Sequence, residues 1–136
     1  MVVVVDRARL EGIPFFGGMP ASELDAIAGV ATEREFAVGE PLTSEGDFGH
    51  CLFVIESGSA EVSTHGGAIR VVGPGAVVGE IAVLASGRRT ASVVATTPVC
   101  AVSFFKRDVW NLAREAPELE RRLREALGEH VGSASD

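Results

Sequence analysis

Hydrophobic and polar positions follow two different periods along the chain and divide it into three zones. The first zone, from about Arg7 to Thr32, has the spacing of a helix, with Ser22 as its expected N-cap. The apolar face expected for this helix consists of Leu24, Ile27, Ala28 and Ala31. Three apolar residues just before it are expected to pack against whatever the helix covers: Ile13, Phe15 and Phe16.

The second zone, from about Glu33 to Phe105, has the shorter period of β-strands. Residues alternate between apolar and polar in Ala60–Ser63, whereas Cys51–Ile55 and Val99–Phe105, which are apolar apart from Ser103, are typical of more fully buried strands. Turn-forming stretches such as Gly73-Pro74-Gly75 separate these runs at short intervals. Many short strands joined in this way predict an antiparallel sandwich, jelly roll or barrel.

The third zone is helical again. We expect one helix over Lys106–Glu115, with Val109, Trp110 and Ala113 on its inner face. Pro117 is well placed in the first turn of a second helix. The apolar stripe of this second helix consists of Leu119, Leu123, Ala126 and Leu127.

No linker long enough to separate two domains interrupts these zones. The 136 residues correspond to one ordinary domain. We therefore expect a single domain over residues 1–131, followed by a small, polar and flexible tail over residues 132–136.

Charge and cysteine content narrow the partners and the compartment. The net charge of −7 argues against a nucleic-acid partner, because binding a phosphate backbone needs a dense basic face. The apolar run Val2–Val5 is too short to span a bilayer or to form the core of a signal peptide. We therefore expect a cytoplasmic protein with no membrane partner, in which Cys51 and Cys100 are reduced thiols packed as small core residues.

The segment Val78–Ala95 carries candidate chemistry, and within it Gly79–Ala85 breaks the β pattern. Gly79 lets a ligand approach the backbone, and the carboxylate of Glu80 can accept hydrogen bonds from a sugar hydroxyl. The amides of Ile81 and Ala82 begin a short helical turn, where unpaired N–H groups favour an anion. Arg89 adds a planar fork of donors for phosphate oxygens. This combination predicts a sugar-phosphate ligand.

The same segment resembles the phosphate-binding cassette of the cyclic nucleotide-binding domain family. The resemblance rests on the Gly79-Glu80 pair, the nine-residue step from Glu80 to Arg89, and the strand that begins with Thr90-Ala91-Ser92-Val93. It extends over about residues 10–131. It implies a mainly β fold with flanking helices: an antiparallel, jelly-roll-like β-roll with an N-terminal helix, a short phosphate-cassette helix and two C-terminal helices.

The resemblance also implies roles for individual residues. Glu80 is expected to bind the ribose 2′-OH and Arg89 the cyclic phosphate, with the amides of Ile81 or Ala82 and of Thr90 completing the phosphate site. Threonine at position 90 occurs in family members of either nucleotide preference, and bacterial domains that resemble this one favour cyclic AMP over cyclic GMP. The ligand expected is therefore cyclic AMP, with cyclic GMP as the alternative and no further cofactor.

Two positions depart from the family's pattern. Val78 stands where a phenylalanine often precedes the Gly-Glu pair, which leaves the short helix less tightly hinged. Arg88 stands where a proline often precedes the phosphate arginine, so Arg88 is a second candidate for the phosphate. The spacing favours Arg89.

The sequence gives no support for an enzyme. His50, His65 and His130 do not have the spacing of a metal site, and no Ser/His/Asp arrangement is evident. We therefore expect a non-catalytic sensor domain that transmits nucleotide occupancy through its C-terminal helices, as a homodimer or with a fused or associated effector domain. Two alternatives remain open. Glu80 and Arg89 could form a plain surface ion pair, and the β-roll could serve protein interaction or dimerisation without binding a nucleotide.

Overall fold

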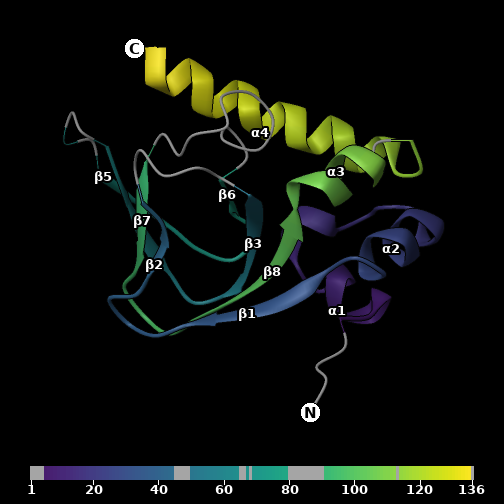
Figure 1. Ribbon diagram of the computed structural model, residues 1–136, viewed down its shortest axis with the longest axis horizontal. Helices are drawn as coiled ribbons and strands as arrows, with labels where there is room; N and C mark the ends of the chain where they lie inside the picture. The colour runs from purple at the N-terminus through teal and green to yellow at the C-terminus, as the bar shows by residue number, and fades with distance from the viewer. Residues whose placement is uncertain are drawn as a thin grey trace.

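The central zone of the chain forms two antiparallel sheets that pack face to face (Figure 1). The computed structural model describes residues 5–44, 50–64, 67, 69–79, 91–112 and 114–135, with side chains through 126. The first sheet has the strand order β1 (Thr32–Phe36), β8 (Val99–Phe105), β3 (Cys51–Ser57) and β6 (Val77–Val78). The second sheet has the order β2 (Pro41–Thr43), β7 (Ser92–Ala95), β4 (Ala60–Ser63) and β5 (Ile69–Val72). The predicted β-roll is confirmed.

The first sheet is covered on both faces. Alternate residues of β3 and β8 face the helices, among them Leu52, Val54, Val102 and Phe104. The residues between them face the second sheet, among them Phe53, Ile55, Val99 and Ala101. Burial on both faces explains why these two strands are apolar at nearly all of their central positions.

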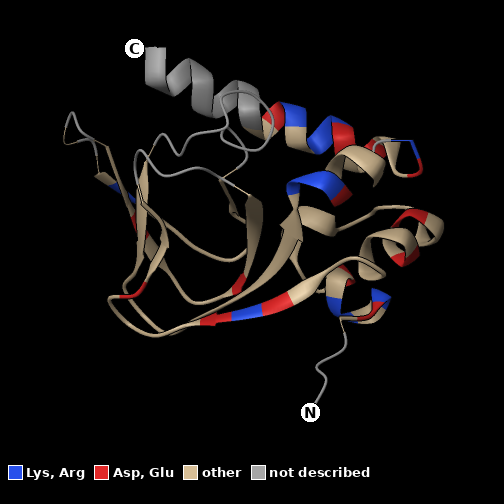
Figure 2. Cartoon of the chain, in the orientation of Figure 1, with Lys and Arg blue, Asp and Glu red and all other residues tan. Residues whose placement is uncertain are grey.

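Helices from both ends of the chain cover the outer face of the first sheet (Figure 1). They are α1 (Arg7–Glu11), the 3₁₀ turn η1 (Pro14–Phe16), α2 (Ala21–Ala28), α3 (Lys106–Leu112) and α4 (Pro117–Ser135). Figure 2 shows that charged residues lie mainly on these helices and on β1, whereas most other strand residues are uncharged. Among the described residues, no helix is both long enough and apolar enough to cross a membrane.

Three helical details differ from the sequence prediction. Ser22 is not the N-cap of α2, because Pro20 takes that position and its carbonyl accepts the first hydrogen bonds of the helix. Trp110 is half exposed, and Leu112 is buried beside Val109 instead, so the inner face of α3 is rotated from the one expected. The helix α4 continues through residues 132–135, where we had expected the tail to begin. Ala113 and the side chain of Leu127 lie outside the described residues.

Both cysteines are free thiols. The sequence predicted core positions for them, but both side chains are only partly buried. Cys51 packs at the edge of the core between the sheets. The thiol of Cys100 lies 3.3 Å from a carboxylate oxygen of Glu56 and 3.4 Å from the guanidinium of Arg9. Burial, and then the hydrogen bond to Glu56, raise the pKa of Cys100 from 9.0 to about 11. Burial therefore keeps Cys100 protonated, with a smaller contribution from its hydrogen bond to Glu56, a contact that the sequence did not predict.

This raised pKa predicts slow alkylation of Cys100 in the folded protein. At pH 8 a thiol with a pKa near 11 has about a hundredfold less thiolate than one near 9, and the thiolate is the reacting species. We expect iodoacetamide to label Cys100 correspondingly slowly, with the rate rising as the pH approaches 11. Mass spectrometry of the labelled peptides measures the rate, and the urea-unfolded protein is the control. Equal rates in folded and unfolded protein would contradict the prediction.

Candidate functional site

The candidate loop over residues 80–90 leaves the first sheet through Gly79. Val78, at the end of β6, pairs with Phe53 of β3 and is buried between the sheets. Gly79 follows with a φ of +90°. This is a conformation that residues with a Cβ rarely adopt. The backbone therefore needs a glycine at the position where the sequence motif has one.

The same loop enters the second sheet through Ala91. The hydroxyl of Thr43, which is buried, donates a hydrogen bond of 3.0 Å to the carbonyl oxygen of Ala91. Ser92 then begins β7 opposite Ser63 of β4. Residues 80–90 thus connect the two sheets of the roll, and both ends of the connection are held by the sheets.

The other predicted site residues lie outside the described residues. They are Glu80, Ile81, Ala82, Arg89 and Thr90, together with the alternative phosphate residue Arg88. Their assigned roles remain predictions. Only Gly79 of the predicted set is described, and its backbone conformation agrees with the role of a glycine at that point.

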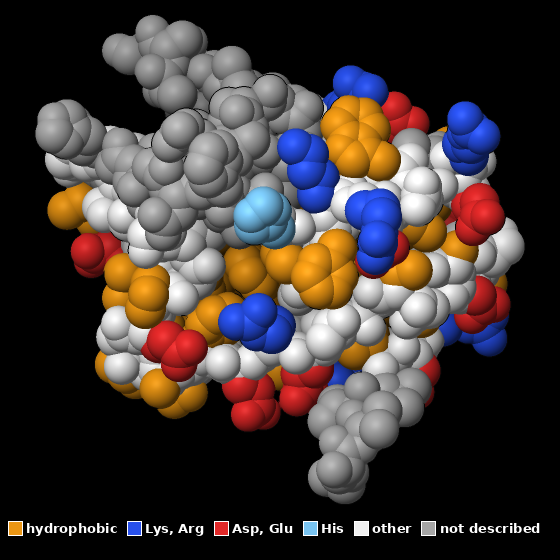
Figure 3. All heavy atoms as spheres, viewed as in Figure 1, with side chains coloured by type: hydrophobic (Ala, Val, Ile, Leu, Met, Phe, Trp, Pro, Cys, Tyr) orange, Lys and Arg blue, Asp and Glu red, His pale blue; other side chains and the backbone are white. Residues whose placement is uncertain are grey.

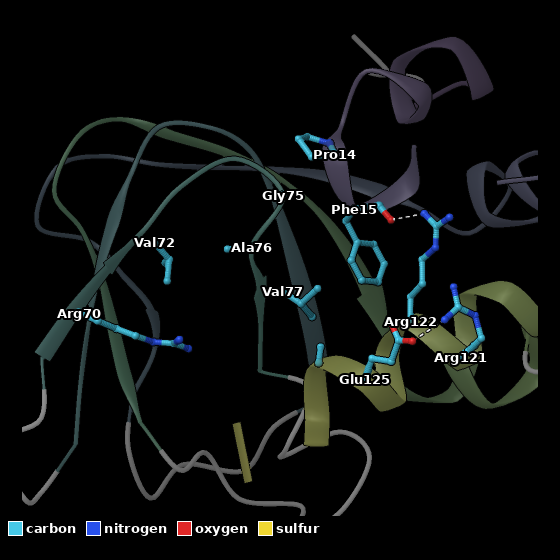
Figure 4. Close-up of a pocket in the computed structure, with 11 residues that line it drawn as sticks. Pro14, Phe15, Arg70, Val72, Gly75, Ala76, Val77, Arg121, Arg122 and Glu125 are labelled. Carbon is cyan, nitrogen blue, oxygen red and sulfur yellow. Dashed lines mark hydrogen bonds and ion pairs between the residues drawn. The ribbon is translucent and has the colours of Figure 1, made fainter. Parts of the chain in front are cut away.

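A cavity of about 550 Å³ lies next to the strand that leads into Gly79 (Figure 4). Its walls come from β5, the turn between β5 and β6, η1 and α4, and it is lined by Pro14, Phe15, Arg70, Val72, Gly75, Ala76, Val77, Arg121, Arg122, Glu125 and Ala126. A volume of this size is typical of small-molecule sites. Val77 lines the cavity and also belongs to β6, the strand that leads into Gly79. One wall of the cavity therefore lies close in the sequence to the candidate loop.

Gly75 allows η1 to form one wall of this cavity. A Cβ added to Gly75 would lie 2.9 Å from the Cβ of Pro14, and the φ of Gly75 is +90°. Both observations exclude a larger residue without displacement of η1. The close approach of η1 brings Phe15 to the cavity wall.

Charged side chains stand on two opposite walls. Arg70 extends from β5 into the cavity, whereas Arg121, Arg122 and Glu125 come from α4 (Figure 4). Guanidinium groups donate hydrogen bonds and accept none, so the cavity suits a ligand that combines apolar surface with acceptor atoms or negative charge. Sequence reasoning missed these residues, although strand alternation in β5 does place Arg70 on the same face as Val72.

The charges on α4 neutralise one another in part. Arg121 binds both Glu118 and Glu125, and Arg122 binds Glu118 at 2.9 Å. Hydrogen bonds from Arg121, and next from Arg122, lower the pKa of Glu118 from 4.5 to about 2. Glu118 is therefore ionised throughout the physiological range.

Among the described residues, no group of three or more His, Cys, Asp or Glu side chains could hold a metal ion. On the face shown in Figure 3, basic side chains lie largely over the helical side of the molecule and are interspersed with acidic and apolar ones.

Comparison with known proteins agrees with the fold. The family model described as "Cyclic nucleotide-binding domain" matches residues 33–116. The cyclic AMP receptor protein of Thermus thermophilus is 32% identical over 130 residues, which are 86% of this chain and 60% of that protein. A cGMP-dependent protein kinase of Toxoplasma gondii is 32% identical over 90 residues, which are 66% of this chain and 9% of the kinase.

Solved structures give the same result. The crystal structure of the Thermus thermophilus catabolite activator protein matches with a TM-score of 0.76 at 31% identity. That match covers 90% of this chain and 60% of the other. The chain thus spans only part of these longer relatives.

Proposed function

Because the chain belongs to the cyclic nucleotide-binding domain family, we propose that it binds a cyclic nucleotide, with cyclic AMP preferred over cyclic GMP. The observation that carries the proposal is the cavity lined in part by Val77 of β6, the strand that in the sequence precedes Gly79 and the loop motif with Glu80 and Arg89. The apolar walls suit a purine ring, and the loop supplies a carboxylate for the ribose and a guanidinium for the phosphate. The relative named as a cyclic AMP receptor supports the preference for cyclic AMP.

In this proposal the residues of the motif have separate tasks. Glu80 accepts a hydrogen bond from the ribose 2′-OH, and Arg89 neutralises the cyclic phosphate. The amides of Ile81 or Ala82 and of Thr90 donate to the phosphate oxygens. Gly79 keeps the backbone free of a side chain where the ligand approaches.

The C-terminal helices are the proposed route for transmitting occupancy. The helix α4 contributes Arg121, Arg122, Glu125 and Ala126 to the cavity wall, so a ligand in the cavity contacts this helix directly. A ligand that binds one arrangement of α4 more tightly than another shifts the population toward the first. An effector on the same or another chain would respond to that shift. The domain itself performs no chemical step in this proposal.

Calorimetric titration with cyclic AMP, cyclic GMP and linear 5′-AMP tests the function. We expect wild-type protein to bind cyclic AMP most tightly and Arg89→Ala to bind it about a hundredfold more weakly, since a charge-assisted partner of the phosphate is lost. Arg88→Ala is the matched control, because it removes the same charge one residue away, and we expect less than a threefold change.

Each outcome of this titration has a distinct meaning. No binding of either cyclic nucleotide by wild-type protein would reject the proposal in favour of a β-roll for protein interaction. A large effect of Arg88→Ala with little effect of Arg89→Ala would move the phosphate contact to Arg88. Tighter binding of cyclic GMP would reverse the ligand preference.

A further inference from the structure

Arg122 joins α4 to the N-terminal segment at the wall of the cavity. Its Nη1 donates hydrogen bonds to the carbonyl oxygens of Phe15, at 2.7 Å, and Gly17, at 2.8 Å. Its Nε donates to Glu118 at 2.9 Å. The side chain is only 20% exposed. One guanidinium thus binds two backbone oxygens more than 100 positions away in the chain, of which Figure 4 shows the one of Phe15, and a carboxylate on its own helix.

A second contact reinforces the same connection. Glu23 of α2 is buried, and its carboxylate accepts a hydrogen bond of 2.9 Å from the backbone N–H of Glu118. Glu118 lies in the first turn of α4, directly after Pro117. The negative charge of Glu23 also interacts favourably with the positive end of the α4 dipole. Both contacts therefore hold the first turns of α4 against η1 and α2.

These contacts help to hold two walls of the cavity at their distance from each other. Phe15 and Arg122 both line the cavity, and Ala126 lies one turn further along α4 on the same wall. The sheet does not fix this distance, because β5 and β6 form the other side of the cavity. Leu119 and Leu123 of α4 belong to the same hydrophobic core as Phe16, and the bonds of Arg122 add direct polar contacts between the η1 wall and the α4 wall at the cavity.

We propose that Arg122 is a positioning residue for ligand binding, an inference that rests on the proposed function. By bonding Phe15 and Gly17 it holds α4 at the distance from η1 at which a bound nucleotide touches both walls. Loss of these bonds lets α4 move away, so that bound ligand dissociates faster while the encounter rate changes little. Lysine does not substitute for this residue, because an ammonium lacks the planar fork that binds two carbonyls and a carboxylate together.

The test compares Arg122→Gln and Arg122→Lys with wild-type protein. A fluorescent cyclic AMP analogue and stopped-flow mixing give the association and dissociation rates. We expect both variants to raise the dissociation rate about tenfold and to change the association rate less than twofold. Arg124→Gln is the matched control, because this exposed arginine pairs only with Glu120 in the described contacts and does not line the cavity described above. We expect its association and dissociation rates to match those of wild type.

Thermal unfolding and hydrogen exchange separate positioning from a general loss of stability. All rates are measured at least 20 °C below the melting temperature of each variant, so that the unfolded fraction is negligible. If Arg122→Gln does not fold, Arg122→Lys keeps the charge and carries the test. Amide exchange is expected to accelerate in residues 16–19 and in the first turns of α4, and not in β3 or β8.

The outcomes distinguish this inference from the function on which it rests. If wild-type protein binds the analogue and both Arg122 variants dissociate at the wild-type rate, the positioning role is wrong and the proposed function stands. If wild-type protein binds no cyclic nucleotide, the function and this inference fail together. An equal effect of Arg124→Gln would show a nonspecific charge effect and also overturn the inference.

Discussion

Gly58→Ala is expected to destabilise the protein by about 4 kcal/mol, the largest effect that we predict for a single methyl group. Gly58 has a φ of +92° and follows β3 directly. A Cβ at this position would lie 2.2 Å from the carbonyl oxygen of Pro98 and 3.0 Å from Cα of Val99. Both obstacles are backbone atoms at the start of β8, so no side-chain rotation can relieve the contact.

The neighbouring hydrogen bonds explain why the backbone cannot simply shift. The N–H of Ser59 donates to the hydroxyl oxygen of Thr97 at 2.9 Å, and the N–H of Thr96 donates to the carbonyl oxygen of Ser59 at 3.0 Å. These bonds connect the turn after β3 with the turn before β8. Displacing Gly58 from Pro98 would break them as well as strain the backbone.

Gly39→Ala is the matched control for this prediction. Gly39 has a similar φ of +85°, but nothing lies within 4 Å of an added Cβ. The substitution should therefore cost only the backbone term, about 1 kcal/mol. Urea unfolding followed by circular dichroism measures both variants. Equal losses for Gly58→Ala and Gly39→Ala would show that the contact with Pro98 is unimportant.

The sequence predicted best those features that depend on neighbours in the chain. The largely apolar stretch Val99–Phe105 matches β8 residue for residue. A strand that is buried on both faces can be recognised from its own apolar residues, without knowledge of its neighbouring strands. The role predicted for Gly79 was the close approach of a ligand, and the positive φ of Gly79 is a separate reason for a glycine that the structure adds.

The sequence predicted poorly those features that depend on which surfaces meet. Trp110 was expected to face inward, but α3 buries Val109 and Leu112 instead, and in a helix this short a modest rotation about its axis decides whether Trp110 or Leu112 is buried. Only the packing of α3 after β8 selects between the two faces. The periodicity of seven residues does not contain that information.

The charged residues around the cavity were missed for the same reason. Arg70 and Arg122 are 52 positions apart, and Phe15 is a further 55 positions from Arg70. No spacing rule connects a strand, a 3₁₀ turn and a helix from separate zones of the chain. The cavity emerges only when η1 and α4 pack beside the roll. Long-range electrostatic pairs likewise join residues that no spacing rule connects, and the cluster around Arg9 is the clearest case.

Arg9→Met is expected to destabilise the protein by about 3 kcal/mol at pH 7, because it leaves two partly buried carboxylates without their cation. The guanidinium of Arg9 binds both oxygens of Glu56, at 2.7 and 2.8 Å, and lies 2.6 Å from Glu33. The three side chains are between 18% and 24% exposed. This cluster attaches α1 to β1 and β3, and methionine keeps much of the aliphatic volume while removing the charge.

The matched control is Arg7→Met on the same helix. Arg7 pairs with Asp25 at 3.4 Å, and the two side chains are 47% and 62% exposed. Solvent screens such a pair, so we expect a loss below about 0.5 kcal/mol. A comparable loss for the two variants would mean that Arg9 acts through its aliphatic contacts and not through its charge.

The pH dependence provides an independent check on the mechanism. The hydrogen bond from Arg9 lowers the pKa of Glu56 below its usual value of 4.5. Stabilisation from this pair is therefore complete above pH 4.5 and disappears as the pH falls through the lowered pKa of the folded protein. The difference in unfolding free energy between wild type and Arg9→Met should be constant from pH 7 to about pH 5 and then shrink in more acidic solution. Urea unfolding at each pH measures this difference; a gap that stays constant down to pH 3 would show that ionised Glu56 is not what Arg9 stabilises.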